Sequence, residues 1–282
     1  MSPDRLGDLV ADITTCRRCP RLVAWREEVA RTKVARHRDS VYWGRPVPGF
    51  GDPRARLLVL GLAPAAHGAN RSGRVFTGDN PGGSGEILYE ALYRAGYSPR
   101  PRSVGPADDL RLRDCYVAAV NRCAPPANKP TTEERDACLP FLVRELRLLD
   151  RVKVLLVLGG YAWDAALRVL AGEGHRVSPK PRFGHGAEAQ VGPYTLVGCY
   201  HPSQQNTFTG RLTTGMLDDV LARTCDITQA GSRGEPNRAD RPGLRYPPGL
   251  ARALSRVCLA VEMSEDGPKR EVDGRGHLQQ LP

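Results

Sequence analysis

Gly61-Leu-Ala-Pro-Ala-Ala-His-Gly-Ala-Asn-Arg-Ser-Gly-Arg-Val-Phe-Thr-Gly-Asp79 is the stretch around which the rest of the chain is organised. It follows the apolar run 57–60 and precedes a helical apolar pattern over 87–95, which predicts a loop between a buried strand and a helix. Such a loop lies at the carboxyl edge of a sheet, where open α/β folds bind ligands. Its spacing is neither G-x-G-x-x-G nor G-x-x-x-x-G-K-[ST], so it is not a loop of the nucleotide-phosphate type.

Working outward from this loop, apolar segments that read as strands alternate with helical patterns. The predicted strands are 56–62, 115–121, 152–158 and 194–200, and the predicted helices are 5–15, 22–34, 87–95, 131–149, 161–170 and 212–221. This alternation predicts an α/β fold with a mostly parallel sheet and helices on both sides. The segment 172–189 reads as a polar, glycine-rich excursion. We expect a folded domain over 1–225, followed by a low-complexity, disordered basic tail over 226–282.

Composition narrows the functional classes. The chain has 282 residues and a formal net charge of +10, which is consistent with nucleic acid or an acidic membrane surface as partner, and equally with a charge that only aids solubility. No run of about 18 apolar residues and no secretory signal is visible, so we expect a cytoplasmic protein without a membrane partner. In that compartment, close pairs among the eight cysteines are first read as metal ligands.

Four cysteines form a candidate metal site. Cys16 and Cys19 are a C-x-x-C pair at the end of a predicted helix, Cys123 follows the second strand, and Cys138 lies in the next helix. Four thiolates fit either a structural zinc ion or a four-iron cluster, and the spacing alone does not choose between them.

Polar side chains also gather at the predicted sheet edge. His201-Pro-Ser203 follows the last strand, and Asn121 ends the second one. His201 and Asn121 therefore come to the same edge as His67 and Asp79 of the central loop, which predicts a functional site there.

Together these motifs resemble the uracil-DNA glycosylase superfamily, and most closely its family 5 (type b). The resemblance rests on the stretch 61–79, on His201-Pro-Ser203, on Asn121-Arg-Cys-Ala-Pro-Pro-Ala-Asn-Lys-Pro130 and on the cysteine spacing. It implies a three-layer α/β/α sandwich with a central four-stranded parallel sheet. It further implies a 4Fe-4S cluster, rather than zinc, near the N-terminal arm.

The resemblance also implies an activity. We expect a DNA repair enzyme that flips uracil, and other deaminated bases such as hypoxanthine, out of double- or single-stranded DNA and hydrolyses the N-glycosidic bond to leave an abasic site. The enzyme would be monofunctional because no lysine stands beside the motifs as an amine nucleophile. We expect a monomer. The alternative is a non-catalytic iron–sulfur or zinc DNA-binding protein with the same basic charge.

The chemistry assigns roles to these residues. His201 is expected to donate to the base oxygen as it becomes anionic, and Asp79 to orient water and offset the cationic sugar. Many superfamily members carry an acid or Asn in the first motif where this chain has Leu62, Ala63 and Ala65, and the resemblance points to Asp79 as the substitute. The predicted catalytic residues are Asp79, His201 and Asn121, and the predicted substrate-binding residues are Gly61, Ala63, His67, Asn70, Phe76 (as stacking platform), Asn128, Ser203 and Gln205.

Overall fold

The structure is a computed structural model that describes residues 5–77 and 81–230. These residues belong to the first of the two units into which the chain divides, Met1–Glu235. The prediction for Asp79 and most of the predicted tail lie outside the described residues. None of the helices in the described part of the chain is long and apolar enough to cross a membrane.

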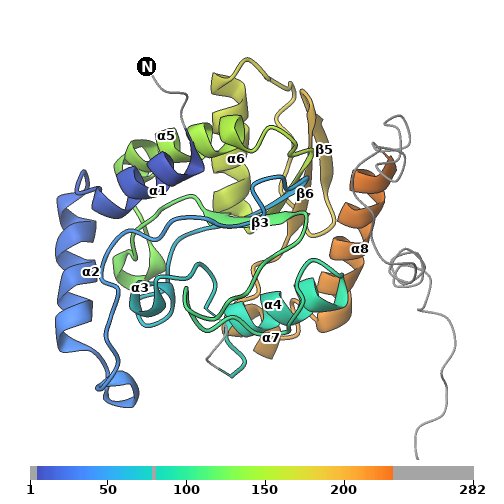
Figure 1. Cartoon of the computed structure of the whole chain (residues 1–282). Helices are drawn as coiled ribbons and strands as arrows, with labels where there is room; N and C mark the ends of the chain where they lie inside the picture. The colour runs from blue at the N-terminus through green and yellow to red at the C-terminus, as the bar shows by residue number, and fades with distance from the viewer. Residues whose placement is uncertain (1–4, 78–80, 231–282) are drawn as a thin grey trace, which may run out of the picture. The chain divides into compact units, whose positions relative to one another are not determined.

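The described residues form an α/β domain (Figure 1). The strands are β1 Phe50–Gly51, β2 Leu57–Gly61, β3 Cys115–Ala119, β4 Val154–Leu158, β5 Glu188–Val191 and β6 Tyr194–Cys199. The helices are α1 Leu6–Thr15, α2 Pro20–Thr32, α3 Ala69–Ser72, α4 Ser84–Arg94, α5 Thr132–Leu148, α6 Gly160–Gly172, α7 Gln204–Phe208 and α8 Thr214–Ala230, with 3-10 turns η1 at Ala35–His37 and η2 at Pro126–Asn128.

The sheet has the strand order β1-β3-β2-β4-β6-β5. Its four central strands are parallel, which confirms the four strands predicted from the apolar runs. The expected four-stranded sheet was incomplete, because β1 pairs with β3 and β5 with β6, both antiparallel, to give a six-stranded sheet. Apolar patterning does not reveal these edges: β1 has two residues, and in β5 only Val191 is fully buried.

Helices cover both faces of this sheet. Leu57 and Val59 pack against α4 and α8, whereas Leu58 and Leu60 point the other way, toward α5 and α6. Alternation along a strand sends successive side chains to opposite faces, so a strand covered on both sides must be apolar throughout. Figure 1 shows these helices on the two sides of the sheet, and the three-layer α/β/α arrangement is confirmed.

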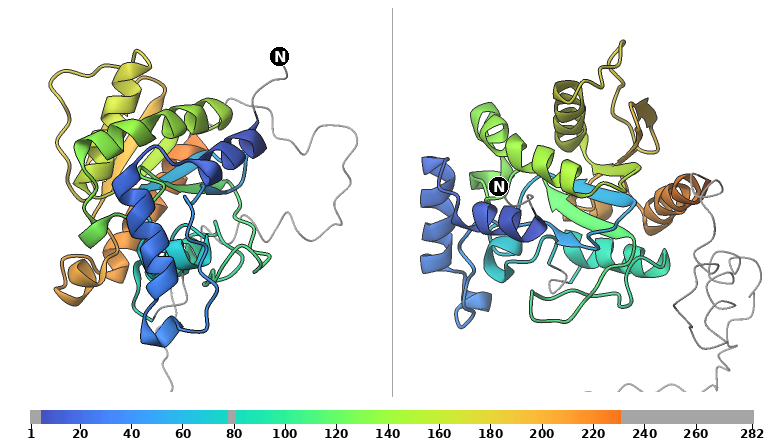
Figure 2. Two further views of the ribbon diagram at one scale, coloured as in Figure 1. Left: turned by 90° about the vertical axis from the view of Figure 1, so that its left-hand side faces the viewer. Right: turned by 45° about the horizontal axis from the view of Figure 1, so that its top comes forward.

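The N-terminal helices lie outside these layers. Leu9 and Ile13 of α1 pack against Phe141 of α5, and α2 runs on from there along the edge of the domain (Figure 2). Cys16 ends α1, and Cys19 precedes α2, which begins at a proline, a residue well suited to the first helical position. The C-x-x-C pair therefore occupies the connection between two helices.

The structure confirms the predicted start of helix α5, but helix α8 ends later than the sequence predicted. Thr131 and Glu134 form the predicted capping box at the start of α5. Helix α8 continues to Ala230, five residues past the predicted domain boundary at 225, and Thr228 in this last part is 2% exposed. In this part Ile227 packs against the core and Thr228 Oγ1 donates to the Cys225 carbonyl, but Ile227 by itself gives no apolar periodicity that would have indicated the extension.

Candidate active site and thiolate centre

A cavity of about 380 Å³ opens at the carboxyl edge of the sheet. Strands β2 and β4 are neighbours, but the helices that follow them, α4 and α6, cover opposite faces. The edge at which these strands end is where open α/β folds bind ligands, and the loop after β2 forms most of the cavity wall there. The volume lies within the usual range for small-molecule pockets.

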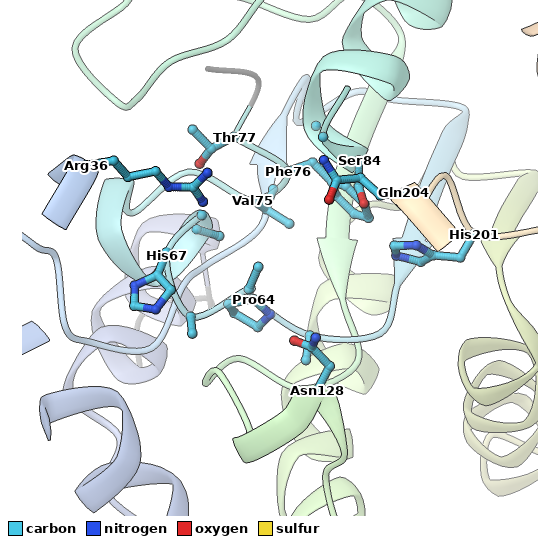
Figure 3. Close-up of a pocket in the computed structure, with 17 residues that line it drawn as sticks. Arg36, Pro64, His67, Val75, Phe76, Thr77, Ser84, Asn128, His201 and Gln204 are labelled. Carbon is cyan, nitrogen blue, oxygen red and sulfur yellow. The ribbon is translucent and has the colours of Figure 1, made fainter. Parts of the chain in front are cut away.

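Apart from Arg36, which belongs to η1, the cavity wall comes from segments that follow three strands. The loop after β2 contributes the largest share, the segment after β3 contributes Asn128, and the segment after β6 contributes His201 and Gln204. Figure 3 shows Phe76 and His201 on one side of the cavity, with Asn128 below them and His67 and Arg36 across from them. The full lining is Arg36, Ala63, Pro64, Ala65, Ala66, His67, Gly68, Ala69, Val75, Phe76, Thr77, Gly83, Ser84, Gly85, Asn128, His201 and Gln204.

Phe76 and His201 form an aromatic pair. Their ring centroids are 5.8 Å apart with an interplanar angle of 31°. Phe76 has a φ of +54°, which is uncommon for a bulky residue and turns its ring back over Gly61. A Cβ at Gly61 would lie 2.5 Å from Cζ of Phe76, so the glycine makes room for the ring rather than touching a ligand.

His201 is held from its backbone and electrically neutral. The amide of Asn206 donates to the His201 carbonyl at 2.8 Å, and the Ser203 N–H donates to it at 2.7 Å. Burial lowers the pKa of His201 to about 4. At neutral pH the imidazole therefore carries one N–H donor and no charge, which suits a hydrogen bond to a polar atom in the cavity.

His67 lies on the opposite wall. Its Nδ1 is 3.0 Å from the hydroxyl of Tyr42, which comes from the segment before β1. Burial, together with the nearby charges of Arg36 and Arg71, lowers the pKa of His67. The cavity thus has two imidazoles that both favour the neutral form.

Two predicted asparagines lie beneath the cavity rather than in its wall. Asn121 is fully buried, with its amide nitrogen donating to the Glu134 carbonyl at 3.1 Å and its oxygen accepting from the Tyr161 hydroxyl at 2.6 Å. Asn70 is also fully buried, and its Nδ2 donates to the Arg26 carbonyl at 3.2 Å. Both amides therefore fix neighbouring segments, and Asn128 is the asparagine that faces the cavity.

Of the residues that follow His201, Ser203 has a structural role and Gln205 lies on the surface. The Ser203 side chain caps α7 by accepting from the Asn206 N–H, and Gln205 is exposed. Gln204, one position earlier, is also exposed but lines the cavity. Of the predicted site residues, the structure brings Ala63, His67, Phe76, Asn128 and His201 together in the wall.

Besides Gln204, sequence reasoning missed three polar wall residues, Arg36, Thr77 and Ser84. Arg36 belongs to the turn η1, in a region that showed no clear pattern, so no signal identified it. Ser84 opens α4 and Thr77 directly follows Phe76, and both come within the segment that the loop-to-helix pattern had already marked. A polar residue at the first turn of the helix after a binding loop was the available signal for Ser84.

The four predicted metal-ligand cysteines meet at a second, smaller cavity. All four cysteines line it, although Cys16 and Cys19 come from the connection between α1 and α2, Cys123 from the segment after β3, and Cys138 from α5. Among residues 5–77 and 81–230, no group of three or more His, Cys, Asp or Glu is placed to hold a single metal ion, so what these cysteines share is the cavity that they line.

Three of these sulfur atoms accept hydrogen bonds. Arg26 Nη1 donates to Cys123 Sγ at 2.9 Å, the Arg122 backbone N–H to Cys138 Sγ at 3.3 Å, and Arg18 Nε to Cys16 Sγ at 3.4 Å. Burial raises the pKa of Cys123 to about 11 and that of Cys138 to about 12. Such thiols lose their protons when a positively charged metal group binds, and N–H donors then stabilise the thiolates. The residues present therefore fit a metal–sulfur group.

The fold and site thus define an open α/β protein with a cavity at the carboxyl edge of its sheet, an aromatic pair in the wall of that cavity, and four cysteines around a second, smaller cavity. Residues 48–223 match the family model described as the uracil DNA glycosylase superfamily. The chain belongs to this superfamily, as the sequence motifs indicated.

Individual relatives within this superfamily differ in how similar they are to the chain. The chain is 56% identical over 216 residues to the type-5 uracil-DNA glycosylase of Mycobacterium bovis, covering 76% of this chain and 78% of the relative. It is 54% identical over 213 residues to the type-5 enzyme of Thermus thermophilus, covering 75% and 93%. The type-4 uracil-DNA glycosylase of Archaeoglobus fulgidus is 27% identical over 201 residues, covering 71% and 82%. The similarity is thus greater to these type-5 enzymes than to the type-4 enzyme.

Proposed function

We propose that this chain is a monofunctional DNA repair glycosylase that removes uracil from DNA by hydrolysing its N-glycosidic bond and leaves an abasic site. The observation that carries the proposal is the pairing of Phe76 with a neutral His201 across one wall of the cavity. Type-5 uracil-DNA glycosylases at more than half identity support the same activity.

Phe76 and His201 divide the work on the base. Moving a base out of the DNA stack costs a few kcal/mol of stacking and pairing free energy. An aromatic side chain in the pocket offsets part of this cost by stacking on the base. Phe76 supplies that surface. As the glycosidic bond breaks, negative charge develops on the base, and the His201 N–H stabilises it by donating to the base oxygen. A neutral donor is appropriate, because burial disfavours a charged imidazole at this position.

The rest of the wall bears on base selectivity. Ala63, Ala65 and Ala66 give this part of the cavity small apolar side chains. Without a polar group of the first motif to reject a different hydrogen-bonding edge, the pocket accepts hypoxanthine as well as uracil. Asn128 and Gln204, which both line the cavity, offer amide donors and acceptors to either base.

Water activation belongs to Asp79 in this proposal. The assignment comes from the sequence motif alone, since Asp79 lies outside the described residues. The first-motif positions facing the cavity, Ala63 and Ala65, have no group that can orient water. A carboxylate would orient the attacking water and offset the positive charge that develops on the sugar.

Cys16, Cys19, Cys123 and Cys138 hold a 4Fe-4S cluster in this proposal. Their convergence on one cavity and the hydrogen bonds to three of their sulfurs support it. The cluster would act as a cross-link between the N-terminal helices and the segment after β3. A single zinc ion is the alternative.

The partner is double- or single-stranded DNA that contains a damaged base, and the net charge of +10 favours binding to its phosphates. We further propose a monomer that acts in the cytoplasm.

A panel assay tests the proposal. The full chain is incubated with labelled duplexes and single strands that contain uracil, hypoxanthine or only normal bases, and abasic sites are scored by alkaline cleavage. We expect cleavage at uracil and hypoxanthine and none in the normal strand. DNA binding without any cleavage would instead support the non-catalytic alternative.

A further inference from the structure

Arg26 is a buried cation in the wall of the thiolate centre. It belongs to α2, is 2% exposed and lines the same small cavity as the four cysteines. Burying a guanidinium is costly unless it is paired and hydrogen-bonded, so its partners show what the charge is for.

These partners are a cysteine sulfur and a cysteine carbonyl. Arg26 Nη1 lies 2.9 Å from Cys123 Sγ, and Nη1 and Nη2 lie 3.3 and 3.2 Å from the Cys16 carbonyl oxygen. Glu27 approaches Nη2 only to 3.8 Å, is about half exposed, and is bound by both terminal nitrogens of Arg17. The Arg26 charge is therefore directed mainly at the thiolate centre.

The other arginines at this centre differ from Arg26. Arg122 is equally buried, but its guanidinium forms an ion pair with the fully buried carboxylate of Glu145, so the pair is neutral. It reaches the centre through its backbone N–H only. Arg18 is exposed, so water screens its charge. Among these three arginines, Arg26 is the one whose buried guanidinium contacts a sulfur directly, with only the more distant Glu27 carboxylate, at 3.8 Å, to offset its charge.

We propose that Arg26 is a positioning residue of the thiolate centre whose buried charge and N–H donor raise the reduction potential of the cluster proposed above. Four thiolates make such a cluster anionic, and adding an electron increases its negative charge. A buried cation and a hydrogen bond to a ligating sulfur favour the more negative, reduced form. The inference rests on the cofactor proposal and is independent of the base that the enzyme excises.

The test measures the cluster rather than excision. Arg26→Met removes the charge and donor and leaves an apolar side chain of similar length. Arg26→Lys keeps a charge but cannot reproduce the planar fork. Arg31→Met is the matched control, because Arg31 lies on the same helix but is exposed and paired with Glu28. Each purified full-length variant is compared for iron content, circular dichroism, one-electron midpoint potential by film voltammetry, and rate of bleaching near 400 nm under a chelator.

We expect Arg26→Met to shift the midpoint to more negative values by about 59 mV or more, the equivalent of a tenfold change for one electron. Bleaching should also become faster. Arg26→Lys should lie between it and the parent, and Arg31→Met should match the parent. If Arg26→Met does not fold, the midpoint potential and the bleaching rate of Arg26→Lys test the proposal in its place.

Two negative results are distinguishable. A colourless parent protein would overturn the cofactor proposal, and this inference with it. A brown parent whose Arg26 variants retain iron, midpoint and bleaching rate would overturn the role of Arg26 alone. Uracil excision by the parent bears on the proposed reaction and on neither of these.

Discussion

Replacing Gly61 with alanine tests whether Phe76 is the surface on which the base stacks. The new Cβ would lie 2.5 Å from Cζ and 2.7 Å from Cε2 of the Phe76 ring, whereas ordinary contact begins at 3.4 Å. The ring must therefore move by about 0.9 Å, the difference between the first and last of these distances. The atoms in the way are the far end of one side chain rather than backbone, so the ring can shift without disrupting β2.

A displacement of about 1 Å in a group that positions substrate can reduce the rate roughly 10²-fold. We expect Gly61→Ala to lower single-turnover excision of uracil from a labelled duplex to this extent, with little change in melting temperature. Gly172→Ala is the control, since a Cβ there meets nothing within 4 Å and alanine suits the end of α6. A Gly61→Ala enzyme that excises uracil at the parent rate would refute the stacking role of Phe76.

Four further outcomes are expected. Asp79→Ala should slow excision of uracil and hypoxanthine alike by about 10² to 10⁴, as for other acid–base groups; parent rates on both bases would rule out that residue. Cys123→Ser should lose iron, and should lower the thermal unfolding temperature because the centre joins α1, α2 and α5; unchanged iron content would contradict this. A chain ending at residue 233 should retain excision on gels, and loss of activity in a folded truncation would assign the missing residues a part in DNA binding. Because burial lowers the pKa of His201 from 6.5 to about 4, its burial destabilises the fold increasingly as pH falls below 6.5. In urea titrations, the free energy of unfolding of the parent should fall between pH 7 and pH 5 by about 2 kcal/mol more than that of His201→Gln. Equal decreases in the two proteins would mean that the His201 imidazole is solvated in the folded state.

The layered core was predictable because buried parallel strands are apolar on both faces. Continuous runs such as Leu57–Leu60 have few other interpretations when helical patterns separate them. The edge strands were not predictable by this route. In β5 the first three residues are exposed or partly buried, and its pairing with β6 depends on backbone hydrogen bonds, which leave no apolar pattern in the sequence.

The site was predictable in location and only partly in detail. Because the four central strands are parallel, the segments that follow them meet at one edge of the sheet, which is why His67, Phe76 and His201 share a cavity. Whether an amide faces that cavity or the layer beneath depends on packing: Asn121 finds both of its partners in α5 and α6, and Asn70 bonds to α2. No local sequence pattern records these long-range contacts.

Single-turnover excision of uracil by the parent and by His201→Ala tests the central claim most directly. DNA affinity is measured in parallel on an uncleavable duplex, to separate binding from chemistry. Loss of one donor to a developing oxyanion costs about 10²- to 10³-fold in rate. We predict efficient excision by the parent, a loss of that size in His201→Ala, and equal DNA affinity in both. A parent that binds DNA without excising uracil, or a His201→Ala variant that excises it at the parent rate, would contradict the account.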